Sequence, residues 1–67
     1  MLVYINNKPS NLPDEITNIV QLLDFLNIKR GGTAVAVNNK LIINSKWDQI
    51  RLKEKDNVTI ISAAFGG

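Results

Sequence analysis

The stretch that decides the fold is VTIISAAFGG, residues 58–67. Its first four residues are mostly apolar and β-forming, and a strand of this composition would be an aggregation hazard at a sheet edge. We therefore expect residues 58–61 to form the central strand of a sheet, parallel to the first strand of the chain. Residues 62–67 then leave the middle of the sheet as a tail that ends in Gly66 and Gly67.

The Gly66-Gly67 doublet gives this tail a specific chemical character. Glycine has no Cβ, so two glycines form a thin thread that can enter a channel too narrow for other side chains. A carboxylate on Gly67 is ionised at neutral pH and is a poor electrophile. Acyl chemistry therefore requires activation, most simply as a mixed anhydride with a nucleotide phosphate, and the tail is then a substrate. A frayed end with incidental glycines is the alternative.

Length and composition indicate one small globular domain, residues 1–67. The chain is 45% hydrophobic and 21% charged, as expected for a folded rather than a disordered protein. No apolar run approaches the roughly 20 residues of a membrane span, and the first residues do not have the basic region followed by an apolar stretch that is typical of a signal peptide. We expect a cytoplasmic protein without a membrane partner.

Independent catalysis is not expected, because the chain has no cysteine and no histidine. This composition excludes thiol nucleophiles, imidazole bases and almost every zinc site. The carboxylates are scattered, so we expect no catalytic residue, no metal and no cofactor bound by the protein itself. The net charge of +2 does not indicate a nucleic-acid partner, since the basic residues are spread along the chain.

The first half of the chain predicts a β-hairpin followed by a helix. Residues 2–5 and 8–12 would pair around the turn Asn6-Asn7, and Pro9 places the second strand at a sheet edge. Asn18 and Gln21 have the spacing of a capping box, so the helix should begin there and run for about ten residues. An apolar stripe follows, with Val20 and Phe25 expected to pack beside it and Gly31-Gly32 expected to end the helix; the stripe consists of Ile19, Leu22, Leu23 and Leu26.

The second half predicts another hairpin before the final strand. Residues 33–37 alternate, so that Val35 and Val37 would face the helix, and Asn38-Asn39 would turn the chain into residues 40–42. We expect Trp47 to cover an edge of the core, and residues 54–57 to form a polar turn. The result is an α+β fold, one helix on a mixed sheet, in the order ββαββ.

Several of these features occur together in a known family. They are Leu22-Leu23, the sequence AVAVN at residues 34–38, Trp47, Leu52, the acidic turn at Asp56, the strand at residues 58–61, and Gly66-Gly67. In this set and order, the chain resembles the thiamine-biosynthesis sulfur carriers, which are ubiquitin-like β-grasp proteins. The family usually has glycine where this chain has Lys55, and we expect Asp56 or Asn57 to accommodate the turn instead.

The resemblance implies a function for the tail. A partner adenylating enzyme of the ubiquitin-activating type would use Mg-ATP to convert the Gly67 carboxylate to an acyl-adenylate, with Gly66 as the spacer. Sulfur from a persulfide donor would displace AMP and leave a thiocarboxylate, which thiazole synthase would use to build the thiazole ring of thiamine. The chain would be a protein co-substrate, not an enzyme.

A docking surface is expected on the side of the sheet away from the helix. Alternation places Tyr4, Ala36, Thr59 and Ile61 there, and Phe65 follows in the tail. We expect these residues to form the partner interface.

Three other functions remain open at this point. The small subunit of molybdopterin synthase shares the fold, the tail and the adenylation step, but such chains tend to be longer. A ubiquitin-like modifier would be joined through Gly67 to a lysine of a target protein. A binding module with incidental glycines would keep its function when Gly67 is deleted.

Overall fold

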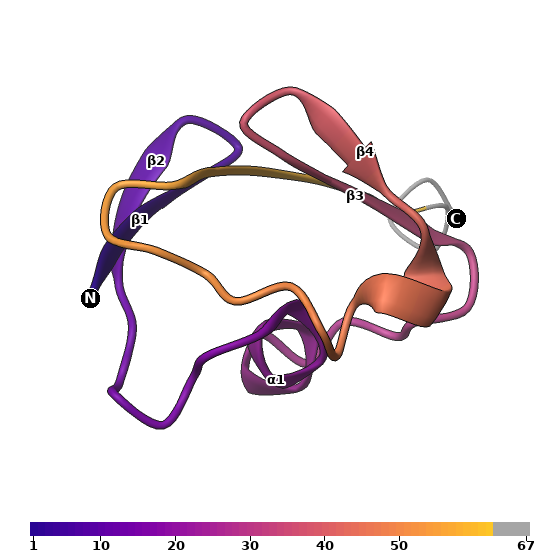
Figure 1. Ribbon diagram of the computed structural model, residues 1–67, viewed down its shortest axis with the longest axis horizontal. Coiled ribbons are helices and arrows are strands. Elements are labelled where there is room, and N and C mark those ends of the chain that lie inside the picture. The colour runs from indigo at the N-terminus through magenta and orange to yellow at the C-terminus, as the bar shows by residue number, and fades with distance from the viewer. Residues whose placement is uncertain (63–67) are drawn as a thin grey trace.

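The computed structural model describes residues 1–62 as one helix packed on one face of a mixed five-stranded sheet (Figure 1). The strands lie side by side in the order β2-β1-β5-β3-β4. This confirms the α+β fold, but the order of elements is ββαβββ rather than ββαββ, because the predicted second hairpin contributes two strands before the final one. The elements are β1 (Leu2–Ile5), β2 (Lys8–Asn11), α1 (Ile19–Phe25), β3 (Thr33–Val37), β4 (Lys40–Ile42), the 3₁₀ turn η1 (Asn44–Lys46) and β5 (Asn57–Ser62).

Two asparagine pairs make the hairpin turns, as predicted. Asn6 and Asn7 have φ values of 49° and 69°, and Asn38 and Asn39 have 52° and 67°. Two consecutive residues in the left-handed region match the right-handed twist of the flanking strands, and asparagine tolerates this region better than most residues. The strand that contains Pro9 lies at the edge of the sheet, where its missing N–H leaves no gap in the strand pairing.

The helix begins where its capping residues predict. The Asn18 Oδ1 accepts from the backbone N–H of Gln21 at 2.8 Å, and the Gln21 Oε1 accepts from the backbone N–H of Asn18 at 3.2 Å. These reciprocal bonds satisfy N–H groups that have no partner inside the helix. The helix spans seven residues, fewer than expected. Three residues of its apolar stripe, Ile19, Leu22 and Leu23, are fully buried, and the fourth, Leu26, is half-buried just after the helix.

The end of the helix differs from the prediction. Asn27, with φ of 58°, takes the left-handed position that was assigned to Gly31-Gly32. The N–H of Ile28 donates to the carbonyl of Leu23 at 2.9 Å and that of Asn27 to the carbonyl of Asp24 at 3.1 Å, which is the Schellman pattern. Ile28 then packs against the core, and this contact makes the earlier stop favourable. Gly32, with φ of 77°, instead serves the turn into β3.

The core lies between the sheet and α1. Val3, Val35 and Val58 are fully buried from the sheet side, and they meet the buried helix residues. Trp47 covers one edge of this core as expected, with 3% of its surface exposed, and its Nε1 donates to the carbonyl of Ile42 at 3.0 Å. Phe25 is 48% exposed, so the expectation that it packs into the core is wrong.

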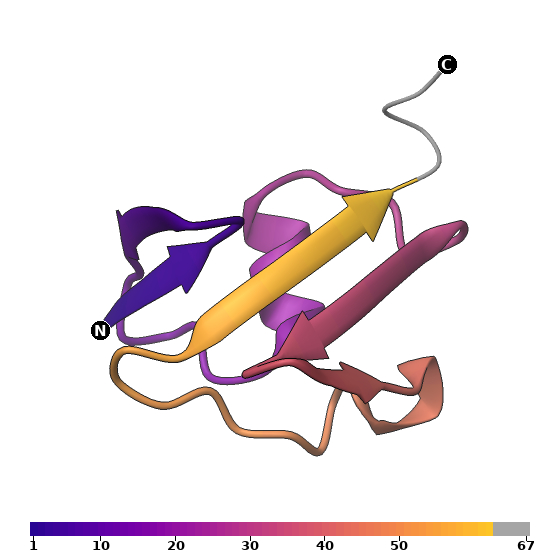
Figure 2. The same cartoon turned by 90° about the horizontal axis from the view of Figure 1, so that it is seen from above.

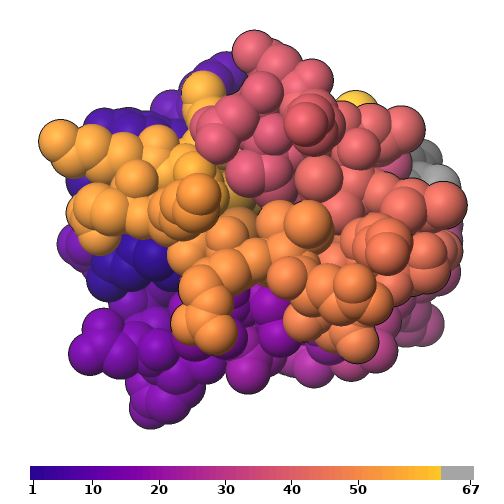
Figure 3. Space-filling view, in the orientation of Figure 1, coloured from indigo at the N-terminus to yellow at the C-terminus, as the bar shows by residue number. Residues whose placement is uncertain are grey.

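The segment between η1 and β5 closes the open side of the two layers (Figures 1 and 3). Leu52 inserts into the core from this segment, and its N–H donates to the carbonyl of Thr17 at 2.9 Å. The polar turn before β5 is formed by Lys55 itself, with φ of 69°; neither Asp56 nor Asn57 takes the left-handed position. Asp56 instead stabilises the turn, because its carboxylate accepts from the N–H of Lys53 at 2.7 Å and from the Asn38 Nδ2 at 3.0 Å.

The central position of β5 is confirmed. It pairs in parallel with β1 and antiparallel with β3, and Figure 2 shows it crossing the middle of the sheet over α1. Ser62, which was expected to open the tail, is the last residue of the strand. The tail residues 63–67, including Phe65, Gly66 and Gly67, lie outside the described part of the chain. Within residues 1–62, no helix is long and apolar enough to cross a membrane.

Candidate functional site: the end of β5 and the outer face of the sheet

The end of β5 is fixed on one side by β3. Ser62 lies opposite Thr33, and Ile61 lies opposite Ala34. The hydroxyl groups of Thr33 and Ser62 are 3.4 Å apart, and Ser62 is only 9% exposed. The chain therefore reaches the start of its tail from an ordered position in the middle of the sheet.

On the other side, the end of β5 is held by a side chain rather than a strand. The backbone of β1 turns away at Asn6, but the Asn6 Oδ1 accepts from the N–H of Ile60 at 2.8 Å. The Asn6 Nδ2 donates to the carbonyl of the same residue at 3.2 Å. The carboxamide thus replaces the next peptide group of β1 and extends the support of β5 by one residue pair. The sequence indicated Asn6 only as a turn residue.

The predicted interface residues lie on the side of the sheet away from α1. Ala36 lies directly opposite Thr59, and Tyr4 lies opposite Asn57, on the neighbouring strand. Thr59 and Ile61 are exposed, with Ile61 at 66%, whereas Tyr4 and Ala36 are half-buried. The structure therefore brings Ala36, Thr59 and Ile61 together on β3 and β5, with Tyr4 beside them on β1. Phe65, the fifth predicted residue, lies outside the described residues.

Two large apolar residues of this surface were missed. Leu41, which lies opposite Ala36 on β4, is 72% exposed, and Ile43 is 64% exposed. Extending the two-residue alternation from β3 across the predicted hairpin would have placed Leu41 on the same face as Ala36. We use "outer face" for the apolar surface made by Ala34, Ala36, Leu41, Ile43 and Ile61. Exposed apolar residues that gather in this way are typical of sites where another protein binds.

The acidic side chains of residues 1–62 are scattered rather than gathered at one site. No three His, Cys, Asp or Glu side chains come together there as ligands for an ion. The features that lie together are the end of β5 and the outer face beside it. This arrangement can present a chain end to another protein.

The fold and site together define a class of protein. One helix on a mixed sheet with the last strand in its centre is the ubiquitin-like β-grasp fold, and here that strand leads into a tail ending in two glycines. The family model of the ThiS family matches residues 3–67, and the chain belongs to this family.

Solved structures agree with this assignment at the level of the fold. The crystal structure of the thiamine biosynthesis protein ThiS from Geobacter metallireducens has a TM-score of 0.82 at 23% identity, covering 92% of this chain and 93% of the other. A solution NMR structure of a thiamine biosynthesis protein from the same organism has a TM-score of 0.76 at 24% identity, covering 91% and 81%. No curated protein matches the chain. Family membership supports the role of a small carrier rather than an enzyme.

Proposed function

We propose that this protein is a sulfur carrier of thiamine biosynthesis that carries sulfur on the carboxyl group of Gly67. Membership of the ThiS family supports this role. The structural observation that carries the proposal is the position of β5, whose last residue, Ser62, lies in the middle of the sheet five residues before Gly67. A tail of five residues spans at most about 17 Å, enough to enter the active site of a partner while the domain stays outside.

The proposed chemistry takes place on the chain end. A carboxylate oxygen of Gly67 attacks the α-phosphorus of Mg-ATP in an adenylating enzyme of the ubiquitin-activating type, and pyrophosphate leaves. The outer sulfur of a persulfide donor then attacks the acyl carbon and displaces AMP. Cleavage of the resulting S–S bond by a thiol leaves the thiocarboxylate, which thiazole synthase consumes. Mg-ATP binds to the partner enzyme, and the carrier supplies only the acyl group.

The outer face is the proposed docking surface for the partner enzymes. It adjoins the end of β5, so a protein that draws in the tail also meets Ile61 and Ala34. The interface residues expected from sequence, Tyr4, Ala36, Thr59 and Ile61, belong to this side of the sheet or border the outer face. Burial of exposed apolar surface would contribute about 25 cal/mol per Å² to the association before its entropic costs.

The decisive experiment is the fragment mass of the tail. The protein is incubated with its adenylating enzyme, Mg-ATP and a persulfide source, and a chain lacking Gly67 serves as control. Oxidation of a methionine gives nearly the same mass gain as replacing oxygen by sulfur. Because the single methionine is Met1, a fragment from the C-terminal end separates the two reactions.

Each outcome of this measurement is informative. Sulfur on a fragment that ends in Gly67, absent from the deletion control, supports the carrier function. An unmodified tail in the presence of an enzyme that modifies another carrier would contradict the proposal and favour a binding module. A product of high molecular mass, in which Gly67 is joined to a lysine, would instead indicate a protein modifier.

The width of the tail provides a further prediction. Gly66→Val should abolish adenylation while the domain stays folded, because a branched side chain does not fit a channel that admits glycine. Pyrophosphate exchange with the adenylating enzyme measures the first step, and thermal unfolding checks the fold. Gly31→Val is a suitable control, since a Cβ added at Gly31 meets no atom within 4 Å. Exchange by Gly66→Val at the wild-type rate would contradict the proposed narrow channel.

A further inference from the structure

The loop between α1 and β3 lies beside the point where the tail begins. Thr33 follows this loop directly and lies opposite Ser62 in the sheet. The hydroxyl of Thr33 donates to the carbonyl of Lys29, so the backbone of Lys29 is close to the same end of β5. Neighbouring strands are separated by about 4.8 Å, which places the backbone of Lys29 within roughly 10 Å of Ser62, the last residue of β5.

This loop has a fixed conformation. Ile28 anchors its beginning, because its N–H donates to the carbonyl of Leu23 and its side chain packs against the core. The N–H of Thr33 donates to the carbonyl of Arg30 at 3.2 Å and anchors its end. The backbone of Lys29 lies between these two anchors, and its side chain is exposed.

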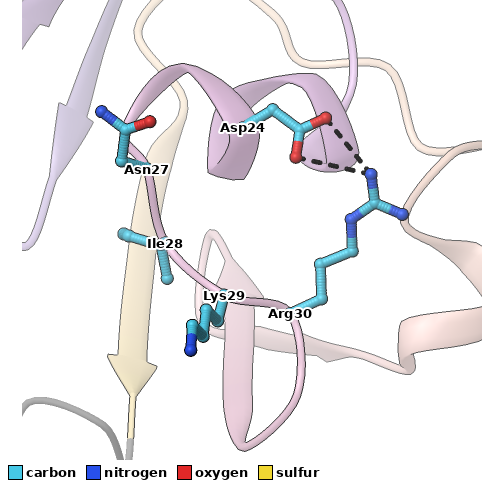
Figure 4. A pocket seen from close by; sticks show the side chains of 5 residues that line it. All are labelled: Asp24, Asn27, Ile28, Lys29 and Arg30. Atoms are coloured by element: carbon cyan, nitrogen blue, oxygen red, sulfur yellow. Dashed lines mark hydrogen bonds and ion pairs between the residues drawn. The ribbon is translucent and has the colours of Figure 1, made fainter.

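The two cations of the loop differ in their surroundings (Figure 4). Arg30 reaches back to Asp24, with its Nη2 at 3.2 Å from the Asp24 Oδ2. The side chain of Lys29 points away from this pair. Within residues 1–62, Arg30 and Asp24 form an ion pair, and Lys29 forms none.

A protein that takes up the tail must come close to Lys29. The tail is at most about 17 Å long, and most of that length is used to reach a buried active site, so the partner surface lies against the end of β5. A lysine that is covered there without a counter-charge loses hydration, at a cost of several kcal/mol. A complementary carboxylate on the partner removes this penalty and also steers the encounter.

We propose that Lys29 docks against an acidic surface at the mouth of the channel in the adenylating enzyme that takes up the tail. This inference rests on the proposed function and adds a charged contact to the apolar outer face. The negative group is a protein carboxylate rather than a nucleotide phosphate, because the phosphates meet Gly67 at the far end of the tail. Lys29 thus helps to orient the domain and takes no part in the chemistry.

A pair of charge reversals tests the contact. Lys29→Glu and Lys40→Glu change the net charge equally, but Lys40 pairs with Val37 at the end of the sheet where β5 begins. We expect Lys29→Glu to raise the Kd for the adenylating enzyme about tenfold at low salt, and Lys29→Ala about two- to fivefold. Lys40→Glu should stay within about twofold of wild type. Calorimetry at low and high salt measures these values, and the difference should shrink as salt is added.

The outcomes separate this inference from the function on which it rests. If the wild type is adenylated and Lys29→Glu binds equally well, the acidic contact is wrong and the carrier function stands. If Lys40→Glu weakens binding as much as Lys29→Glu, the effect comes from net charge and the inference is again wrong. If the wild type is neither bound nor adenylated by an active enzyme, both proposals are wrong. Unchanged thermal unfolding of all variants excludes a folding defect.

Discussion

Ile60 and Ile61 are neighbours of one residue type in one strand, yet Ile60 is 5% exposed and Ile61 is 66% exposed. Ile60 lies opposite Val35 on the side that faces α1, and Ile61 lies opposite Ala34 on the outer face. Alternation along β5 thus divides the sheet into a side that stabilises the domain and a side that is free for another protein. The same backbone serves both, so their contributions can be separated by single substitutions.

The sharpest test of this division is the same truncation at both positions. Ile60→Ala should lower the free energy of unfolding by about 2 to 5 kcal/mol, because it leaves a cavity in the core. Ile61→Ala should lower it by about 1 kcal/mol or less, since the side chain is exposed. Urea unfolding of the two variants measures the difference. Equal losses would show that the outer side also stabilises the domain.

The opposite asymmetry is expected for binding. Ile61→Glu should raise the Kd for the adenylating enzyme about tenfold or more, because a charge would be buried in an apolar contact. Its thermal unfolding should remain close to that of the wild type. Thr59→Glu tests the same side of β5 at a second position, opposite Ala36. Wild-type affinity of Ile61→Glu, measured by calorimetry, would remove Ile61 from the interface.

The two hydrogen bonds between the Asn6 side chain and Ile60 offer a test of how β5 itself is supported. Asn6→Ala removes both side-chain hydrogen bonds to Ile60 and places alanine at a φ of 49°. We expect a loss of about 1 to 2 kcal/mol in the free energy of unfolding. Asn7→Ala, at a φ of 69°, is the matched control, because it changes the turn without touching Ile60. Equal destabilisation by the two variants would mean that the bonds to Ile60 contribute little.

The smallest effect is expected at the turn before β5. Lys55 has a φ of 69°, a conformation that costs a residue with a Cβ roughly 1 to 2 kcal/mol and glycine little. Lys55→Gly should therefore stabilise the domain by about 0.5 to 1 kcal/mol, after the greater flexibility of the unfolded chain is subtracted. Lys53→Gly, at a position without positive φ, should be neutral or destabilising. The melting temperatures of the two variants and the wild type measure the difference. Destabilisation by Lys55→Gly would contradict this account of the turn.

The parts of the fold that depend on local chemistry could be predicted from the sequence. The asparagine pairs set both hairpin turns, Asn18 and Gln21 set the start of α1, and alternation set the two sides of β3 and β5. The end of α1 depended on packing instead. Asn27 and Gly31 could each take a left-handed cap, and the burial of Ile28 decides between them. The exposure of Phe25 has a different origin: it is the last residue of α1, and its position around the helix lies well to the side of the buried residues Ile19, Leu22 and Leu23.

The candidate site was predictable in outline. Its location at the end of a central strand followed from the composition of residues 58–61, and three of its apolar residues followed from alternation. Leu41 could have been found by continuing the alternation across the predicted hairpin. Ile43 lies beyond the end of β4, before η1, where strand alternation no longer predicts the side. The dual bond of Asn6 to Ile60 joins residues 54 positions apart, and nothing in the local sequence of either indicates it. The position of Lys29 near the end of β5 likewise depends on the pairing of Thr33 with Ser62, which the local sequence does not indicate.

The order of the strands also has a consequence for how the chain folds. The β1–β2 and β3–β4 hairpins are not neighbours in the sheet, and β5 is the strand that joins them. Each hairpin can form early from residues close in sequence, but the sheet cannot assemble until β5 inserts between them, about fifty residues after β1. During synthesis, the two halves must therefore wait with exposed apolar surface until Ser62 has emerged from the ribosome. The two-layered domain can therefore close only after β5, the last strand of residues 1–62, has been made.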